Sequence, residues 1–157
     1  MSKIIYKKGN LLDQTENLDL IGHGCNCFLS MGAGIAKEVK ERFSEAHLAD
    51  LNTKYGDRSK LGDYTLAEYD GFKILNLYTQ YKYTRHEVDA DYSAIASVFA
   101  KINEEYEGKS LGIPVIGAGL AGGDWTEISK IIEAETPDLN VFVYILPRNK
   151  NWHYLLS

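Results

Sequence analysis

Two periodicities of apolar residues divide the chain into expected strands and helices. Short runs of aliphatic residues, and runs that alternate apolar with polar positions, are typical of β-strands. They predict strands at 3–9, 18–26, 63–69, 73–80, 110–116 and 139–146. Asp70 and Gly71 stand between the third and fourth of these segments, which is the signature of a tight β-hairpin.

Helices are expected where apolar residues return every three or four positions. This pattern predicts helices at 33–43, 44–55, 89–106 and 124–135. The expected N-caps are Ser44 for the second helix, Asp89 or Asp91 for the third, and Asp124 or Thr126 for the fourth. Gly56 follows the expected end of the second helix, and the tail at 151–157 favours no particular structure.

Buried strands that alternate with amphipathic helices, with one hairpin among them, predict an α/β protein. We expect a three-layer α/β/α arrangement with a central mixed sheet. The chain has 157 residues and shows no repeat, linker or low-complexity tract, so residues 1–157 are expected to form one domain.

The composition narrows the choice of partners. The net charge of −5 disfavours a nucleic-acid backbone as the main ligand. A small anionic ligand fits, because backbone amides and helix N-termini bind phosphate without net positive charge. No long apolar run predicts a signal peptide or a membrane contact, and Cys25 and Cys27 form neither a disulfide framework nor a zinc set. We expect a cytoplasmic monomer with no metal and no cofactor.

Two predicted strand–loop–helix segments are rich in glycine. One runs GHGCNCFLSMGAGIAKEV from Gly22 to Val39, and the other runs PVIGAGLAGGDW from Pro114 to Trp125. Glycine lets the backbone approach a ligand, and each following helix is expected to add the positive end of its dipole. Both loops follow strands, so they are expected at the edge where open α/β sheets bind ligands. There they can hold opposite sides of one diphosphate.

The second loop contains GAGLAG at 117–122, a literal G-x-G-x-x-G. In dinucleotide-binding proteins this pattern follows the first strand, with an acidic residue about 20 positions later at the end of the next strand. Here the pattern comes late, and the nearest acid at that distance, Asp138, precedes the next predicted strand. A nicotinamide-type site is therefore disfavoured. Two tight turns that need glycine and bind no ligand are a further alternative.

Several segments together resemble the macrodomain family, whose fold binds ADP-ribose. They are KKGNLL at 7–12, IGHGCNC at 21–27, SMGAGIAKEVKERF at 30–43, LNLYTQ at 75–80 and IPVIGAGLAGGDW at 113–125. They occur in the family's order and cover most of the chain. The chain is most similar to the branch of ADP-ribose 1''-phosphate phosphatases and terminal ADP-ribose glycohydrolases, and GAGLAGGDW is typical of small bacterial and phage members.

The resemblance implies ligand contacts by position. Gly9, Asn10 and Leu11 would lie near the adenine, although many macrodomains have an aspartate in place of Asn10 that binds the adenine amino group. The implied contacts to the distal ribose and the phosphates are Asn26, Ser30, Met31, Gly32, Ala33, Gly34 and Ile35 from the first loop, and Ile116, Gly117, Ala118, Gly119, Leu120, Ala121, Gly122 and Gly123 from the second. The candidates for an aromatic residue that lines the pocket are Tyr78, Tyr81 and Tyr92.

The glycohydrolase branch uses a lysine nucleophile after the strand that matches LNLYTQ, and an aspartate in the second loop. Gln80 and Ala121 stand near those positions in this chain. A glutamine cannot form the Schiff base that a lysine amine forms, which disfavours this activity. Lys82 is close in sequence and is the alternative nucleophile.

The phosphatase branch has a histidine before its CNC motif, as His23 stands here before residues 25–27. Its imidazole would activate water or protonate a leaving group. The alternative is a structural histidine at the end of a strand, whose ring nitrogens form hydrogen bonds with the backbone. Asp124 is the second catalytic candidate, with an N-cap role as the alternative. Ser30 would bond the terminal phosphate or its own backbone. Nucleophilic cysteines are disfavoured, because packing beside glycine explains both thiols.

We therefore expect hydrolysis of ADP-ribose 1''-phosphate to ADP-ribose and phosphate, driven by positioning and by loop amides that stabilise phosphoryl charge. The histidines and acids show no metal-ligand spacing, and His47, His86 and His153 have no readable partner. Two alternatives stand beside this activity. One is a module that binds ADP-ribose without turnover, and the other is an enzyme that removes ADP-ribose from acidic side chains of proteins.

Overall fold

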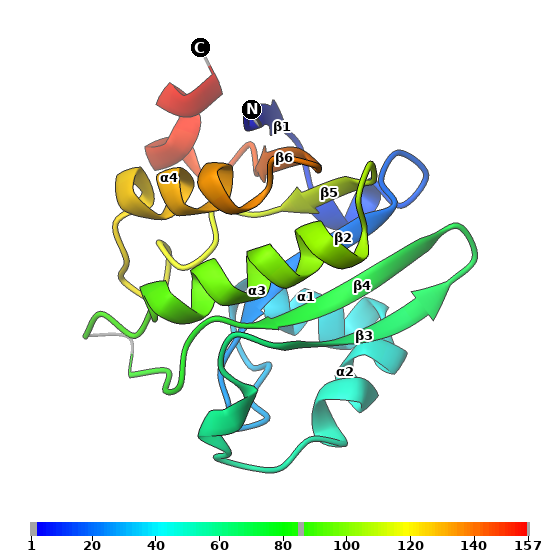
Figure 1. Cartoon of the computed structure of the whole chain (residues 1–157), viewed down its shortest axis with the longest axis vertical. Coiled ribbons are helices and arrows are strands. Elements are labelled where there is room, and N and C mark those ends of the chain that lie inside the picture. Colours follow the sequence, from blue (N-terminus) through cyan, green and yellow to red (C-terminus); the bar gives the residue numbers. More distant parts are fainter. Residues whose placement is uncertain (1–2, 85–86, 157) are drawn as a thin grey trace.

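The sheet brings the ends of five parallel strands to one edge. The computed structural model describes residues 3–84 and 87–156. Its strands are β1 (Ile5–Lys8), β2 (Leu20–Cys25), β3 (Tyr64–Tyr69), β4 (Phe72–Tyr78), β5 (Ser110–Ile113) and β6 (Asn140–Ile145), in the order β1-β6-β5-β2-β4-β3 (Figure 1). The first five in this order are parallel, and β3 pairs antiparallel with β4. The predicted mixed sheet is confirmed.

Helices cover both faces of the sheet, as the three-layer prediction requires. They are α1 (Gly34–Arg42), α2 (Ser44–Leu51), α3 (Tyr92–Glu105) and α4 (Trp125–Glu135), with short 3-10 helices η1 (Leu11–Asp13), η2 (Arg58–Lys60) and η3 (Lys150–Leu156). In Figure 1, α3 and α4 lie in front of the sheet and α1 lies behind it. Alternation along β4 serves both layers: Leu75 and Leu77 belong to the core under α3 and α4, and Ile74 belongs to the core under α1 and α2.

Most turns and caps follow the sequence signals. Asp70 and Gly71 form the hairpin turn, with Gly71 at φ +87°. The open choice between capping residues is resolved: the Asp91 carboxylate accepts from Ala94 N–H at the start of α3, and Asp124 caps α4.

The start of α2 differs from the prediction, because Phe43 and not Ser44 is its N-cap. The N–H of Phe43 donates to the Val39 carbonyl at the end of α1, and its own carbonyl accepts from Ala46 N–H at the start of α2. One residue thus ends one helix and begins the next, which leaves no place for a separate cap. The same helix ends at Leu51, four residues before the predicted end at position 55.

The connections diverge at the centre of the sheet. From β2 the chain runs through α1 and α2 to the β3–β4 hairpin, whereas from the neighbouring β5 it runs through α4 to β6 on the other side. The loops after β2 and β5 therefore leave the same edge toward opposite faces. In open α/β sheets this divergence opens a crevice that binds ligands.

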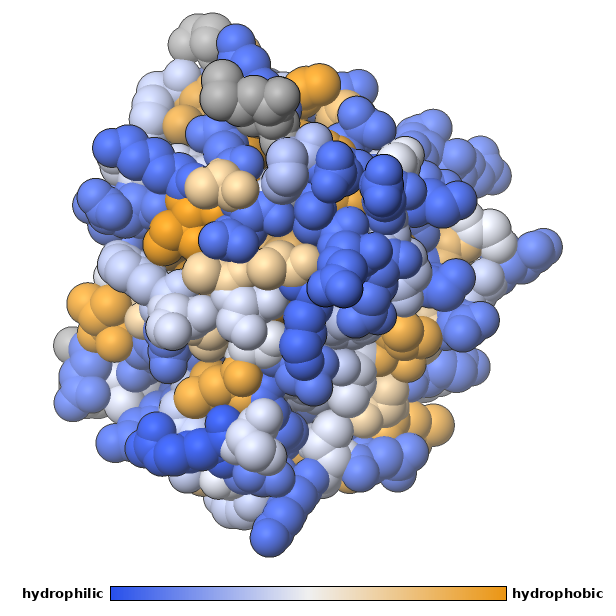
Figure 2. Space-filling view, viewed as in Figure 1, coloured by the Kyte–Doolittle hydropathy of each residue, from blue (hydrophilic) through white to orange (hydrophobic). Residues whose placement is uncertain are grey.

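The apolar side chains of the sheet are covered by the helices, and Val98, Phe99 and Ile132 are fully buried. The face shown in Figure 2 is mostly hydrophilic, with apolar side chains in small separate patches. Within residues 3–84 and 87–156, no helix has the length and apolar character needed to cross a bilayer.

Candidate functional site

A cavity of about 380 Å³ lies along the carboxyl edge of the sheet. Residues that follow each of the five parallel strands line it: Asn10 after β1, Asn26 after β2, Gln80 after β4, Pro114 after β5 and Leu146 after β6. Five neighbouring strands span about 19 Å at roughly 4.8 Å per gap, which suits an extended ligand. The volume falls within the range of roughly 300–1,000 Å³ that is typical of small-molecule sites.

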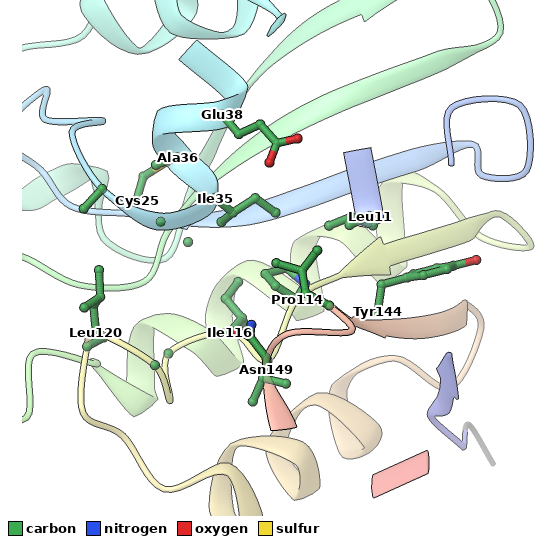
Figure 3. A pocket seen from close by; sticks show the side chains of 18 of the residues that line it. Leu11, Cys25, Ile35, Ala36, Glu38, Pro114, Ile116, Leu120, Tyr144 and Asn149 are labelled. Atoms are coloured by element: carbon green, nitrogen blue, oxygen red, sulfur yellow. The ribbon is translucent and has the colours of Figure 1, made fainter. Parts of the chain in front are cut away.

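The two ends of this cavity differ in their lining. Figure 3 shows Leu120 at one end and Leu11, Glu38 and Tyr144 at the other. We call the first the β4 end, because Gln80 follows β4 there, and the second the β1 end. Between them, Ile35 of α1 and Ile116 of the loop after β5 face each other across the opening.

The first glycine loop, residues 26–33, is held in shape by the side chain of Asn26. Its Nδ2 donates to the Ser30 carbonyl (3.1 Å), and its Oδ1 accepts from Phe28 N–H (2.8 Å). Asn26 is nearly buried and also lines the cavity. Its amide therefore closes the loop that leads into α1.

The N-terminus of α1 opens directly into the cavity. Ala33, the N-cap residue, has extended backbone and offers no capping side chain. The first intrahelical bond comes from Lys37 N–H, so the amides of Gly34, Ile35 and Ala36 have no intrahelical partner. These three residues and Ala33 line the cavity. Free amides and the positive end of a helix dipole favour an anion at this point.

The second glycine loop, residues 116–123, reaches the cavity in a different way. Its turn is tied by Gly123 N–H to the Gly117 carbonyl (2.8 Å), and five of its eight residues, Ile116, Gly117, Gly119, Leu120 and Ala121, line the cavity. Asp124 lies beyond these residues and caps α4, accepting from Thr126 N–H (2.9 Å). The expectation that both following helices add a free dipole is therefore wrong for α4, because a carboxylate already occupies its N-terminus.

The predicted contacts divide into two groups in the structure. Those that line the cavity are Asn10, Leu11, Asn26, Ser30, Gly32, Ala33, Gly34, Ile35, Ile116, Gly117, Gly119, Leu120 and Ala121. Those that are not part of the lining are Gly9, Met31, Ala118, Gly122, Gly123, His23 and Asp124.

None of the three tyrosines considered for the pocket is part of its lining. The Tyr78 hydroxyl donates to buried Asp50 (2.7 Å), the Tyr81 hydroxyl donates to the Gly56 carbonyl (2.9 Å), and the Tyr92 hydroxyl accepts from the N–H of Asp124 (2.9 Å). Tyr83 and Tyr144 line the cavity instead.

Sequence reasoning missed the contribution of the segment after β6. Tyr144, Leu146, Arg148, Asn149 and Trp152 all line the cavity. The available signal was positional, because the end of every parallel strand lies at the same edge. This segment contains no glycine pattern, so nothing in its composition pointed to a ligand.

His23 is completely buried and is not part of the cavity lining. Asn76 donates its amide to the Ala46 carbonyl (2.9 Å), which leaves its Oδ1 to accept from His23 Nε2 (2.7 Å). Burial lowers the pKa of His23 to about 4, and the bond to Asn76 offsets only part of this effect. The role of His23 in activating water stays a prediction, and its buried, partnered ring argues for a structural role.

The other candidate groups are placed as follows. Asp124 is exposed and acts as an N-cap, which was the alternative to its catalytic role. Lys82 is exposed and is not part of the lining, whereas Gln80 is. Burial raises the pKa of the Cys25 thiol well above its usual value, and Cys27 shows a shift in the same direction.

His47 and His153 have no part in the cavity lining. His153 Nε2 lies 3.3 Å from the Leu146 carbonyl, and His47 is half-buried on α2. His86 lies outside the described residues. Over the described part of the chain, no three histidine, cysteine or acidic side chains gather as a metal site.

The architecture defines an α/β protein with a crevice along the carboxyl edge of its parallel strands. No family model matches the chain. It is 33% identical over 147 residues to an uncharacterized 17.5 kDa protein of Enterobacteria phage T4, covering 88% of this chain and 93% of the relative. It is 30% identical over 154 residues to bovine ADP-ribose glycohydrolase OARD1, and the match covers 92% of this chain and 93% of the relative. It is 25% identical to ADP-ribose 1''-phosphate phosphatase of Saccharomyces cerevisiae, and the match covers 93% of this chain and 100% of the relative.

Solved structures agree with this relationship. The macrodomain of Mycobacterium tuberculosis DarG superposes with a TM-score of 0.71 at 22% identity, covering 92% of this chain and 98% of that one. A protein of unknown function from Bacteroides thetaiotaomicron superposes with a TM-score of 0.78 at 24% identity, covering 91% of this chain and 98% of that one. The chain belongs to the macrodomain family. Its named relatives are hydrolases of ADP-ribose derivatives.

Proposed function

We propose that this macrodomain binds ADP-ribose in the cavity and hydrolyses ADP-ribose 1''-phosphate to ADP-ribose and phosphate. The observation that carries the proposal is the uncapped N-terminus of α1, which opens into the cavity opposite residues 116–121. A diphosphate held there accepts hydrogen bonds from the amides of Gly34, Ile35 and Ala36. The name of the yeast relative supports the choice of substrate.

The two ends of the cavity suit the two ends of this ligand. The β1 end has aromatic and aliphatic side chains, among them Leu11 and Tyr144, which fit the faces of a nucleobase. The first loop, which follows β2, adds polar groups to the lining, among them Ser30, whose hydroxyl is a donor for a terminal phosphate. The distal ribose would therefore lie near Leu120.

In the reaction, water adds to phosphorus and the bond between phosphorus and the oxygen on C1'' breaks. The proton of the attacking water ends on the departing oxygen, so the products are ADP-ribose and inorganic phosphate. Backbone amides of the two loops would stabilise the charge on the phosphoryl oxygens. We assign His23 and Asp124 a structural role, in which they support the two loops. His23 is fully buried, and Asp124 caps α4.

The test combines two measurements on the purified protein. Calorimetry measures ADP-ribose binding, and a phosphate assay measures turnover of ADP-ribose 1''-phosphate. We expect both signals, and we expect His23→Gln and Asp124→Asn to retain turnover within about threefold. Binding without phosphate release overturns the enzymatic half of the proposal, and absence of binding overturns all of it.

ADP-ribose recognition without turnover is the second candidate, and the charge of the lining favours it. Among the described residues that line the cavity, the charged side chains are Glu38 and Arg148, and the β4 end is lined by neutral groups. A third assay, on protein carrying glutamate-linked ADP-ribose, covers the activity named for the bovine relative. Loss of that activity in Lys82→Ala would favour a glycohydrolase over both other candidates.

A further inference from the structure

One buried hydroxyl beside the cavity has no hydrogen-bond partner. In the part of the chain that the structure describes, Thr79 Oγ1 is the buried side-chain nitrogen or oxygen left without one. Thr79 directly follows β4 and is 1% exposed, and the next residue, Gln80, lines the cavity. Because a buried hydroxyl without a partner costs folding free energy, its presence here points to a role other than stability.

The backbone of Thr79 is fully engaged, so only its hydroxyl is unused. Its N–H donates to the Cys25 carbonyl at the end of β2 (3.3 Å), and its carbonyl accepts from the N–H of Asp91, the N-cap of α3 (2.8 Å). These two bonds fix the residue between the sheet and α3. The position of the hydroxyl is therefore set by the fold.

Two residues of the cavity lining stand next to this hydroxyl. A Cβ on Gly24 of β2 would lie 2.8 Å from Thr79 Oγ1 and 3.2 Å from Ile116 Cγ1. Gly24 and Ile116 both line the cavity, so the hydroxyl lies directly behind its wall. A side chain at position 24 would collide with the hydroxyl, and only glycine accommodates it where it lies.

Strand order places the hydroxyl beyond the diphosphate of the proposed ligand. In the sheet, β2 leads into α1, whose amides face the cavity, and β4 is its neighbour on the side away from β1. A ligand that runs from β1 past the N-terminus of α1 has its far end at β4. In ADP-ribose this far end is the distal ribose, and in ADP-ribose 1''-phosphate it also carries the terminal phosphate.

We propose that the Thr79 hydroxyl is a specificity determinant for this distal half of the ligand, an inference that rests on the proposed function. A hydroxyl donates to a phosphate oxygen and accepts from a ribose hydroxyl, so it suits either group. The bond forms after rotation of the Ile116 side chain, or through one water. Ligands that reach the hydroxyl supply its missing partner, and ligands that end at the diphosphate do not.

The test compares ADP-ribose with ADP, which ends at the diphosphate and has no distal ribose. In calorimetry on the full chain, Thr79→Val should lose roughly two- to tenfold in ADP-ribose affinity, the size of one hydrogen bond. Its ADP affinity should match wild type. Thr79→Ser keeps a hydroxyl and should keep the wild-type preference for ADP-ribose over ADP.

The stability of the free protein gives an independent measurement. Valine has the shape of threonine without the hydroxyl, so Thr79→Val should raise the thermal midpoint by roughly 2–4 °C. Thr136→Val is the matched control, because that buried hydroxyl donates to the Ile132 carbonyl (2.7 Å) and lies outside the lining. It should lower the midpoint and leave both affinities unchanged.

The possible results separate the inference from the proposed function. A midpoint that does not rise in Thr79→Val would show that the hydroxyl is paired within the fold. That result, an unchanged ADP-ribose affinity, or equal losses for ADP and ADP-ribose overturns the inference and leaves the proposed function standing. Wild-type protein that binds neither nucleotide overturns both.

Discussion

The two glycine-rich segments look alike in sequence but differ in what they offer a ligand. The first leads into α1, whose N-cap Ala33 provides no side-chain acceptor, so the amides of the first turn face the cavity. The second leads into α4, whose first turn is capped by Asp124 outside the cavity. One segment presents a helix N-terminus, and the other presents only the backbone and side chains of a loop.

This difference shows that glycine content alone does not make an anion site. Glycine permits the chain to turn and to approach a ligand, but the capping residue decides whether the helix dipole remains available. The strands beneath the two segments differ too. β2 carries the buried polar pair of His23 and Asn76, whereas β5 places Gly112 among apolar side chains of Leu11 and Leu18.

The largest expected effect is on the pH dependence of stability, and it comes from His23 on β2, the strand that leads into the first segment. His23 has a folded-state pKa of about 4 against 6.5 when unfolded, so the unfolded chain binds more protons between these pH values. Stability should fall as the pH drops below about 6.5, with a total loss of about 3 kcal/mol near pH 4. Denaturant titrations at several pH values measure this slope.

His23→Gln removes the titrating group and keeps a donor for Asn76, so it should flatten the slope between pH 6.5 and 4. His153→Gln is the matched control, because that ring is partly exposed on η3, and it should keep the wild-type slope. Parallel slopes in the wild-type and His23→Gln proteins would mean that the buried imidazole does not govern acid sensitivity.

The second effect concerns the close packing of the second segment. A Cβ on Gly123 would lie 2.6 Å from the Gly117 carbonyl oxygen and 2.8 Å from Ile128, so Gly123→Ala should cost about 2 kcal/mol. Gly119→Ala, in the same loop, meets no atom within 4 Å and should change stability by less than about 0.5 kcal/mol. Equal losses in urea unfolding would contradict the difference in packing.

The third prediction converts the first segment into a copy of the second. Ala33→Asp places a carboxylate cap at the N-terminus of α1, which should stabilise the fold by about 1 kcal/mol. The same charge should weaken ADP-ribose binding by about tenfold or more, because it competes for the amides and repels the diphosphate. Ala33→Asn caps without charge and should weaken binding less. A stabilised Ala33→Asp protein with wild-type affinity would exclude α1 as the diphosphate site.

The smallest effect is expected at the cap of the second segment. Asp124→Ala removes the acceptor for Thr126 N–H and should cost about 1 kcal/mol in thermal unfolding. ADP-ribose affinity and phosphate release should stay within about twofold of wild type, since Asp124 is not part of the cavity lining. A tenfold loss of turnover in a folded Asp124→Ala protein would restore its catalytic role.

Much of the fold could be predicted because its signals are local. The Asp70-Gly71 hairpin, the strand segments and the Asp91 and Asp124 caps each depend on a few adjacent residues. The start of α2 could not be predicted this way, because Phe43 serves two helices at once and Ser44 satisfied the usual capping rule. Two glycine loops at one edge followed from strand order, since loops after parallel strands share that edge.

The sequence by itself determined the alternation of strands and helices, the two glycine loops and the resemblance to macrodomains, because these depend on periodicity and on motifs within short segments. Only the tertiary structure decided which polar groups meet the cavity. It buried His23 outside the cavity lining, and it brought Glu38 to Asn10 across 28 positions. It also added the segment around Arg148 to the lining. Such contacts depend on strand order and helix packing, which no local pattern encodes.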